Sequence, residues 1–222
     1  MDIKNLPGMI DLSCVKTEST FDELNTMVAM ARKYRTICCF AMPCYTQWLI
    51  DQLKDEKDII VGGAVGFPSG ADLTEIKVTT ARRFVELGCG ELDMVINVSA
   101  LKSGHYDLVE NDIRQVFDCS NGLPLKVILE VAYLTDYEIQ KGSELAVKNG
   151  TSYVKTGTGW ACKPTTIDHI RLIHSTIGDS AKIKAAGGVR TLDDIKHMID
   201  AGCSRFGIGI RSAQHIFDEA GL

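Results

Sequence analysis

The sequence has no apolar run long enough to cross a membrane, and it does not begin with a basic stretch followed by an apolar one. Met1–Ile10 carries charges and a proline instead. It also lacks an excess of positive charge, because its net charge is −5, whereas binding to a phosphate backbone needs clustered positive charge. These absences predict a cytoplasmic protein that binds neither membranes nor nucleic acid.

Paired cysteines with the Cys-x-x-Cys spacing of a zinc site are missing as well. The eight cysteines are Cys14, Cys38, Cys39, Cys44, Cys89, Cys119, Cys162 and Cys203. Free cysteine behaves as a small hydrophobic residue, and disulfides are rare in the cytosol. We therefore expect reduced, mostly buried thiols and no metal site.

The 222 residues are 45% hydrophobic and 24% charged, which is typical of one substantial core. Short β-rich runs alternate with amphipathic stretches, as in a parallel sheet crossed by helices. The predicted strands are Met9–Ser13, Thr36–Ala41, Ile59–Val65, Glu91–Asn97, Leu125–Val131, Ser152–Thr156, Lys182–Ala186 and Arg205–Ile208. Eight strand–helix units with short connections predict an α/β fold, a (β/α)8 TIM barrel forming a single domain over residues 1–222.

Helix boundaries support this alternation. Ser19 or Thr20 is expected to cap a helix that continues through Glu23, and Thr135 and Thr191 precede acidic residues in the same way. Glycines follow three predicted helices, at Gly88, Gly150 and Gly202, where a left-handed cap suits a residue without a Cβ.

Charged residues inside predicted strands need an explanation, because parallel strands are normally covered on both faces. In Glu91–Asn97 the alternation puts Asp93, Val95 and Asn97 on one face, toward the barrel interior, and Leu92, Met94 and Ile96 toward the helices. A carboxylate inside the barrel needs a cationic or hydrogen-bonding partner.

Lys155 and Lys184 are the candidate partners, each near the carboxyl end of a strand, where barrel enzymes gather their catalytic groups. Two ammonium groups held close together would lower each other's pKa, and only a neutral lysine is a nucleophile. The alternative is that both lysines belong to buried ion pairs that balance Asp93 or Glu130. Such networks are of little structural benefit to a core.

The chain resembles the deoxyribose-phosphate aldolase family along nearly its whole length. The motifs that carry the resemblance are Val65–Pro68 with Gly70-Ala71, Glu91–Asn97 with Ala100–Lys102, Val127–Glu130 with Leu134-Thr135, Tyr153–Gly159 and Lys184–Thr191. The resemblance implies a class I aldolase without metal or cofactor, in which Lys155 forms a Schiff base, Lys184 tunes it and Asp93 shares in proton transfer. Its substrates would be small aldehydes and a sugar phosphate, 2-deoxyribose 5-phosphate.

The resemblance also implies a substrate-binding set at the barrel mouth. Its members are Asp11, Thr156, Gly159, Gly187, Gly188, Gly207, Gly209 and Arg211. Glycine-rich backbone at a helix start can hold a phosphate. However, Gly209 and Ile210 stand where many family members have a serine pair, and Trp160 stands where some have a lysine that Lys163 could replace. Arg211 either supplies charge to the phosphate or is a solvated residue of the last helix.

Three readings therefore stand side by side: the deoxyribose-phosphate aldolase, an aldolase of the same mechanism acting on another or unphosphorylated aldol, and a non-catalytic sugar-phosphate-binding barrel. A homodimer is one candidate assembly. The histidines, which are His105, His169, His174, His197 and His215, are expected to have surface or packing roles.

Overall fold

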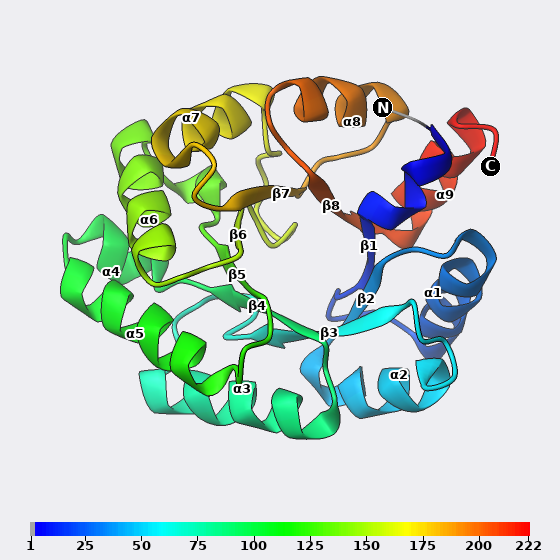
Figure 1. Cartoon of the computed structure of the whole chain (residues 1–222), viewed down its shortest axis with the longest axis horizontal. Coiled ribbons are helices and arrows are strands. Elements are labelled where there is room, and N and C mark those ends of the chain that lie inside the picture. Colours follow the sequence, from blue (N-terminus) through cyan, green and yellow to red (C-terminus); the bar gives the residue numbers. More distant parts are fainter. Residues whose placement is uncertain (1–2) are drawn as a thin grey trace.

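The computed structural model describes residues 3–222 and is a closed barrel of eight parallel strands surrounded by helices (Figure 1). The strands are β1 (Ile10–Cys14), β2 (Cys38–Ala41), β3 (Ile60–Val65), β4 (Glu91–Val95), β5 (Leu125–Ile128), β6 (Tyr153–Lys155), β7 (Lys182–Ala186) and β8 (Arg205–Gly209). They follow one another in chain order, and β1 pairs with β8 to close the ring. The prediction of a (β/α)8 barrel is confirmed.

Helices of two kinds connect the strands. The α-helices are α1 (Phe21–Tyr34), α2 (Thr46–Leu53), α3 (Thr74–Leu87), α4 (Val98–Lys102), α5 (Tyr106–Cys119), α6 (Asp136–Lys148), α7 (Ile167–Ile177), α8 (Leu192–Asp200) and α9 (Ile210–Glu219). Short 3-10 turns occupy Ile3–Asn5, Pro7–Met9, Pro43–Tyr45 and Val131–Tyr133. No helix among residues 3–222 is long and apolar enough to span a membrane.

The helix starts show why the chain changes direction where it does. Thr20, rather than Ser19, caps α1: its hydroxyl accepts from the Glu23 N–H, and the Glu23 carboxylate accepts from the Thr20 N–H. Thr135 and Thr191 form the same reciprocal capping box at α6 and α8. Each such cap contributes about 1 kcal/mol. The caps therefore fix the turn from each strand end into the next helix.

The glycines predicted to follow helices have the expected backbone. Gly88, Gly150 and Gly202 have φ of 95°, 79° and 106°, in the left-handed region that favours glycine. At Gly88 the backbone N–H also donates to carbonyls in the last turn of α3.

The apolar core lies mainly between the strands and the helices. Leu92, Met94 and Ile96 belong to it, as the alternation predicted. One detail of that prediction is wrong: β4 ends at Val95, and Asn97 does not face the barrel but caps α4, where its side-chain oxygen accepts from the Ala100 N–H. An asparagine just after a strand satisfies an otherwise unpaired helix N–H, and this local bond ends the strand early.

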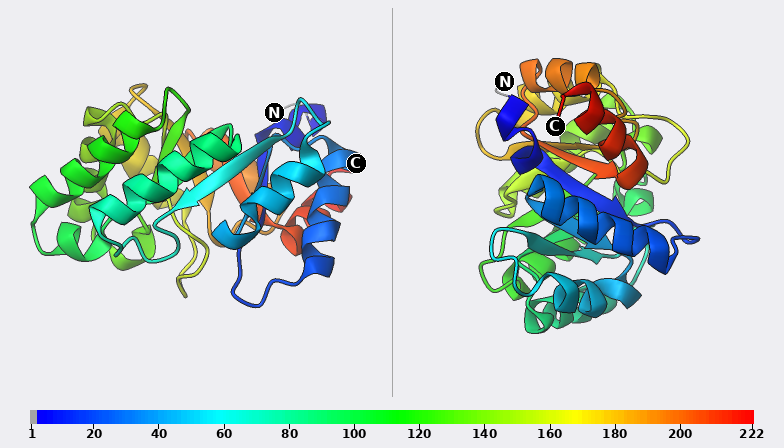
Figure 2. Two further views of the ribbon diagram at one scale, coloured as in Figure 1. Left: turned by 90° about the horizontal axis from the view of Figure 1, so that it is seen from below. Right: turned by 90° about the vertical axis from the view of Figure 1, so that its right-hand side faces the viewer.

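The carboxyl ends of all eight strands lie at one end of the barrel, because the strands are parallel. Figure 2 shows the loops after β1 and after β6 projecting from the same end of the molecule. That end is where a site built from strand termini and the following loops has to be.

Candidate active site

A cavity of about 750 Å³ opens at the carboxyl ends of the strands. Lys155, Lys184 and Asp93 line it, as do most of the residues that the sequence placed there. Lys155 on β6 and Lys184 on β7 are direct neighbours in the parallel register. Neighbours in register point to the same face, so both side chains enter the barrel interior at one level.

Asp93 lies between the two lysines. Its Oδ2 atom is 2.7 Å from Nζ of Lys155 and 2.7 Å from Nζ of Lys184. Asp93 and Lys184 are almost completely buried, and Lys155 is only 8% exposed. The carboxylate is therefore shared by the two ammonium groups that the sequence proposed as its partners.

Further charges, which the sequence analysis did not include, continue this cluster into the barrel. Lys126 on β5 lies 3.1 Å from Asp93 Oδ1 and 2.5 Å from Glu91. Arg205 on β8 joins Glu91, at 2.9 Å, to Asp11, at 2.6 Å. Glu91 lies two residues before Asp93 on β4 and so faces the same side, which could have indicated its place in the cluster. Lys126 lies opposite Asp93 in the register of β4 and β5, and neither segment alone predicts that register.

Asp11 closes the cluster on the β1 side. Its Oδ2 lies 2.5 Å from Nζ of Lys184, although the angle is outside the usual hydrogen-bond range. The side chain lines the cavity and is 1% exposed. Asp11 thus provides Lys184 with a second carboxylate in addition to Asp93.

The pKa of Lys155 is lowered to about 8. Burial is the largest cause, and the neighbouring charge of Lys184 lowers it further, whereas the Asp93 carboxylate raises it. A value near 8 leaves roughly a tenth of the Lys155 side chains neutral at pH 7, about three hundred times the neutral fraction of an ordinary lysine.

Lys184 behaves differently from the expectation that the two lysines lower each other's pKa. Burial lowers its pKa, but the carboxylates of Asp11 and Asp93 outweigh burial and raise it. Asp93 keeps a pKa well below its usual range because the charges of Lys126, Lys155 and Lys184 outweigh the effect of burial. Lys184 therefore stays protonated, and its charge lowers the pKa of Lys155, whereas the pKa of Lys184 itself is raised.

The number of acids and bases inside the barrel explains why the pKa of Lys155 is lowered while that of Lys184 is raised. The cluster holds three acids, Asp11, Glu91 and Asp93, and four bases, Lys126, Lys155, Lys184 and Arg205. Three bases suffice to balance three acids, and Lys155, which has the most exposed side chain of the four, is the surplus cation. Glu130 takes no part: its carboxylate accepts from the backbone N–H and the hydroxyl of Thr158.

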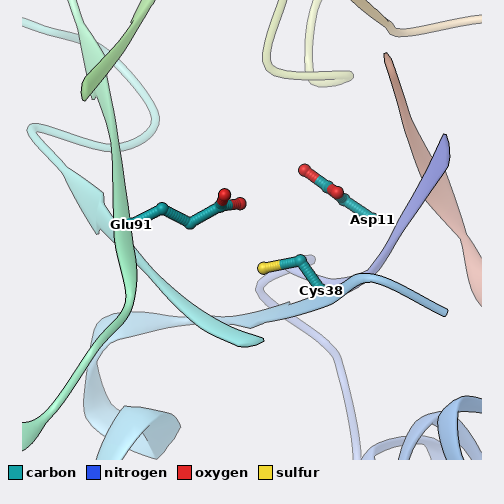
Figure 3. Close-up of side chains that lie close together, drawn as sticks. All are labelled: Asp11, Cys38 and Glu91. Atoms are coloured by element: carbon teal, nitrogen blue, oxygen red, sulfur yellow. The ribbon is translucent and has the colours of Figure 1, made fainter. Parts of the chain in front are cut away.

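Asp11, Cys38 and Glu91 point toward one another from β1, β2 and β4 (Figure 3), close enough to be considered as metal ligands. Both carboxylates already bind Arg205, and Glu91 also pairs with Lys126. Burial and the two carboxylates also raise the pKa of the Cys38 thiol, which disfavours the thiolate that a metal would need. These residues are therefore poorly suited to hold a divalent cation.

Glycine backbone forms the wall of the cavity beside β7 and β8. Gly159, Gly187, Gly188, Gly207 and Gly209 all line it. A Cβ at position 207 would lie 3.3 Å from Cε of Lys184, so this glycine leaves room for the lysine. These five glycines leave this wall without side chains that would fill the cavity.

Arg211 and Thr156 differ from the other predicted binding residues in their exposure and contacts. Arg211 lines the rim, and its side chain is 92% exposed, with one contact of 3.4 Å to Glu23. Thr156 does not line the cavity: it is completely buried, and its hydroxyl donates to the Ala186 carbonyl and accepts from the Ala186 N–H. Thr156 thus stands apart from the other residues predicted to bind substrate, because its hydroxyl ties β6 to β7.

Lys16 is a cavity residue that the sequence reasoning missed. Its Nζ donates to the Gly159 carbonyl at 2.8 Å and lies 5.5 Å from the centre of the Trp160 ring. Trp160 in turn donates to the Val15 carbonyl at 2.9 Å. Lys163, the suggested replacement for a family lysine, is exposed and is not among the lining residues. Loops have no periodicity, so only the position of Lys16 shortly after β1 could have indicated it.

The histidines lie away from this site. None of the five is among the residues that line the cavity. His169 completes the capping box of α7, and His197 and His215 pair with acids one turn away on their own helices. These are the surface and packing roles expected of them.

Comparison with known proteins identifies the family that the sequence motifs resemble. The family model for DeoC/LacD family aldolases matches residues 8–218. A deoxyribose-phosphate aldolase of Exiguobacterium sp. is 42% identical over 202 residues, 91% of each chain, and one of Sinorhizobium medicae is 40% identical over 210 residues, 95% of this chain and 85% of the relative.

Solved structures agree on the architecture. A crystal structure from Coccidioides immitis, assigned to deoxyribose-phosphate aldolase, has a TM-score of 0.95 at 30% identity and covers all of this chain and 88% of its own. The deoxyribose-phosphate aldolase of Aeropyrum pernix, described as a tetramer, shares the fold with a TM-score of 0.88 at 24% identity over 98% of this chain and 91% of its own. By sequence and by fold, the chain belongs to the DeoC/LacD family of aldolases.

Proposed function

We propose that this aldolase reversibly cleaves 2-deoxy-D-ribose 5-phosphate to acetaldehyde and D-glyceraldehyde 3-phosphate through a Schiff base on Lys155. The observation that carries the proposal is the amine of Lys155, which has a pKa of about 8, lines a cavity and lies 2.7 Å from a carboxylate. A non-catalytic binding barrel would have no use for an amine held partly neutral beside a buried acid.

In the cleavage direction, neutral Nζ attacks the aldehyde carbon of the open-chain sugar, and the carbinolamine loses water to give a protonated imine. A base removes the proton of the C3 hydroxyl, the C2–C3 bond breaks, and its electron pair moves to the imine nitrogen. Glyceraldehyde 3-phosphate leaves, and the enamine takes a proton at C2. Hydrolysis then releases acetaldehyde and restores the amine.

Asp93 and Lys184 supply complementary proton-transfer groups for these steps. Asp93 is held as a carboxylate and can accept a proton, directly or through water. Lys184 is held as an ammonium group 2.7 Å from it and can return one. Asp11 and Arg205 position this pair rather than react, because their polar atoms face other charged groups of the cluster.

The proposal is tested by measuring acetaldehyde release from 2-deoxyribose 5-phosphate across a range of pH. Below pH 8 the rate constant kcat/KM should rise about tenfold per pH unit and then level off, because the neutral form of Lys155 increases until its pKa of about 8 is passed. Release only from other or unphosphorylated aldols would favour the alternative substrate, and no release from any aldol would favour the binding barrel.

The phosphate end of the substrate is assigned to the glycine wall and Lys16. Gly187 and Gly188 face the cavity from the β7 end, and Lys16 lies at Gly159 on the same wall. Lys16 stands in the loop after β1, and it supplies a positive charge where hydroxyl side chains are absent at Gly209 and Ile210. Arg211 adds positive charge at the rim.

Replacing Lys16 with methionine should raise KM for 2-deoxyribose 5-phosphate about tenfold to a hundredfold, the value of one hydrogen bond to a charged group, with little change in kcat. KM for unphosphorylated 2-deoxyribose should not change. Lys163→Met, in the loop after β6 but outside the cavity lining, is the matched control. Equal losses with both sugars would mean that Lys16 only joins two loops.

The cellular setting and assembly are proposed on separate grounds. All eight cysteines are free thiols, which supports a cytoplasmic enzyme. Leu73 and Ile76 expose apolar surface at the start of α3, being 66% and 49% exposed, which supports a homodimer. Sedimentation velocity on the purified chain would identify the assembly.

A further inference from the structure

The interior of the barrel has a small apolar cluster beside its charged groups. Cys38, Phe40 and Ala64 form a separate buried cluster on β2 and β3, against which Val15 and Phe67 pack. Phe40 is the only large side chain among its three buried members, is 4% exposed and lines the cavity. Its aromatic ring therefore forms part of the apolar wall of the candidate active site.

Gly62 fixes the place of this ring. Phe40 and Gly62 are partners in the register of β2 and β3. A Cβ at position 62 would lie 2.1 Å from Cζ and 2.3 Å from Cε1 of Phe40, well inside van der Waals contact. The ring thus rests on the bare backbone of β3, and it has no space in which to retreat from the cavity on that side.

Three ammonium groups surround the ring. Its centre lies 4.5 Å from Nζ of Lys184, 5.5 Å from Nζ of Lys126 and 5.6 Å from Nζ of Lys155. A ring within about 6 Å attracts a cation and excludes water. Phe40 therefore contributes to the burial of all three lysine side chains.

The distance to Lys155 also limits what can be bonded to that nitrogen. Carbon atoms in contact are about 3.5–4.0 Å apart, so the 5.6 Å between Nζ and the ring centre leaves roughly 2 Å for atoms added on that side. This is little more than one covalent bond of about 1.5 Å. The imine carbon fits there, so the rest of the acetaldehyde or sugar chain has to run along the ring toward the open cavity, and a second carbon on the reacting position meets the ring.

We propose that Phe40 determines the donor specificity of the aldolase, by admitting acetaldehyde at Lys155 and disfavouring aldehydes with a further carbon on the reacting position, such as propanal. The proposal rests on the Schiff-base chemistry proposed above and names the substrate feature that the site selects. The donor aldehyde becomes the enamine, so this wall lies beside the carbon that forms the new bond.

The test compares acetaldehyde and propanal as donors in the wild type and in Phe40→Ala. Reduction with borohydride traps each imine on Lys155 as an ethyl or propyl adduct, which mass spectrometry counts, and addition to glyceraldehyde 3-phosphate gives kcat/KM for each donor. Discrimination by one methylene is typically about tenfold to two-hundredfold. We expect Phe40→Ala to lower the preference for acetaldehyde at least tenfold in both measurements.

Phe21→Ala is the matched control, because Phe21 is also an aromatic residue but packs on Tyr45, with ring centres 5.2 Å apart, and is not among the residues that line the cavity. It should leave the donor ratio unchanged. Phe40→Leu, which removes less volume, should shift the ratio in the same direction and protects the test against misfolding of the alanine variant, which circular dichroism would detect.

The outcomes separate this proposal from the one on which it rests. If the wild type forms no adduct on Lys155 with either aldehyde, the Schiff-base function fails and the donor role of Phe40 fails with it. If adducts form and the acetaldehyde-to-propanal ratio is the same in the wild type, Phe40→Leu and Phe40→Ala, only the role of Phe40 is refuted.

Discussion

Lys155→Leu is expected to lower kcat for aldol cleavage by about 10⁵-fold or more, the scale of loss when an enzyme is deprived of its covalent nucleophile. Neither of the buried lysines beside it can replace it: Lys184 is held protonated, and Lys126 is completely buried, with its charge paired to Glu91 and Asp93. Incubation with acetaldehyde and borohydride, followed by peptide mapping, should find an ethyl group on Lys155 in the wild type and none in the variant.

The fold should survive this substitution. Removing Lys155 leaves three bases opposite three acids, so no buried carboxylate loses its last partner. Lys163→Leu, which removes an exposed lysine of the same β6–α7 segment, should keep both the adduct and the activity. An adduct that maps to another lysine in the wild type would contradict the assignment.

Lys184→Leu is expected to slow formation of the Lys155 adduct at pH 7 by about a hundredfold. The Lys184 charge is one of the causes that lower the pKa of Lys155, and Asp93, which raises it, would lose one of its competing cations. Both changes raise the pKa of Lys155, and each pKa unit reduces the neutral fraction at pH 7 about tenfold. The midpoint of adduct formation should therefore move from about 8 to higher pH.

This variant should also be less stable, because removing one member of a buried ion pair typically costs about 3–5 kcal/mol. Asp11 keeps Arg205, and Asp93 keeps Lys126, so we expect a folded protein whose free energy of unfolding is reduced. Lys182→Leu, an exposed position on the same strand, is the control for both measurements. An unchanged pH midpoint in Lys184→Leu would refute the proposed electrostatic role of Lys184.

The sequence predicted most of the fold because its signals are local. Alternation within one strand was enough to send Asp93 inward and Leu92 and Met94 outward, and threonines before acidic residues located helix starts. The same locality explains the errors. Asn97 continues the alternation of β4, but its side chain caps the next helix instead, and strand pattern alone cannot distinguish these two uses.

The site could be predicted only in part, because its chemistry depends on contacts between distant segments. The partners of Asp93 include Lys126, which the register of β4 and β5 places opposite it. The contact of Lys16 with Gly159 joins loops 143 positions apart. The pKa of Lys184 rises rather than falls because Asp11, on the first strand, contacts it. Each of these contacts joins two distant segments, so neither segment alone could predict it.

The surplus positive charge in the barrel has a consequence beyond the resting amine. Once Lys155 is condensed with an aldehyde, the iminium nitrogen carries the positive charge that the surroundings disfavour on the free side chain. Neutralising that nitrogen relieves the same electrostatic penalty, and the electron pair of the breaking carbon–carbon bond does so when the enamine forms. The surplus positive charge that keeps part of Lys155 neutral thus also makes the iminium nitrogen a stronger electron acceptor. The same charge therefore favours attack by the amine on the aldehyde and the later cleavage of the carbon–carbon bond.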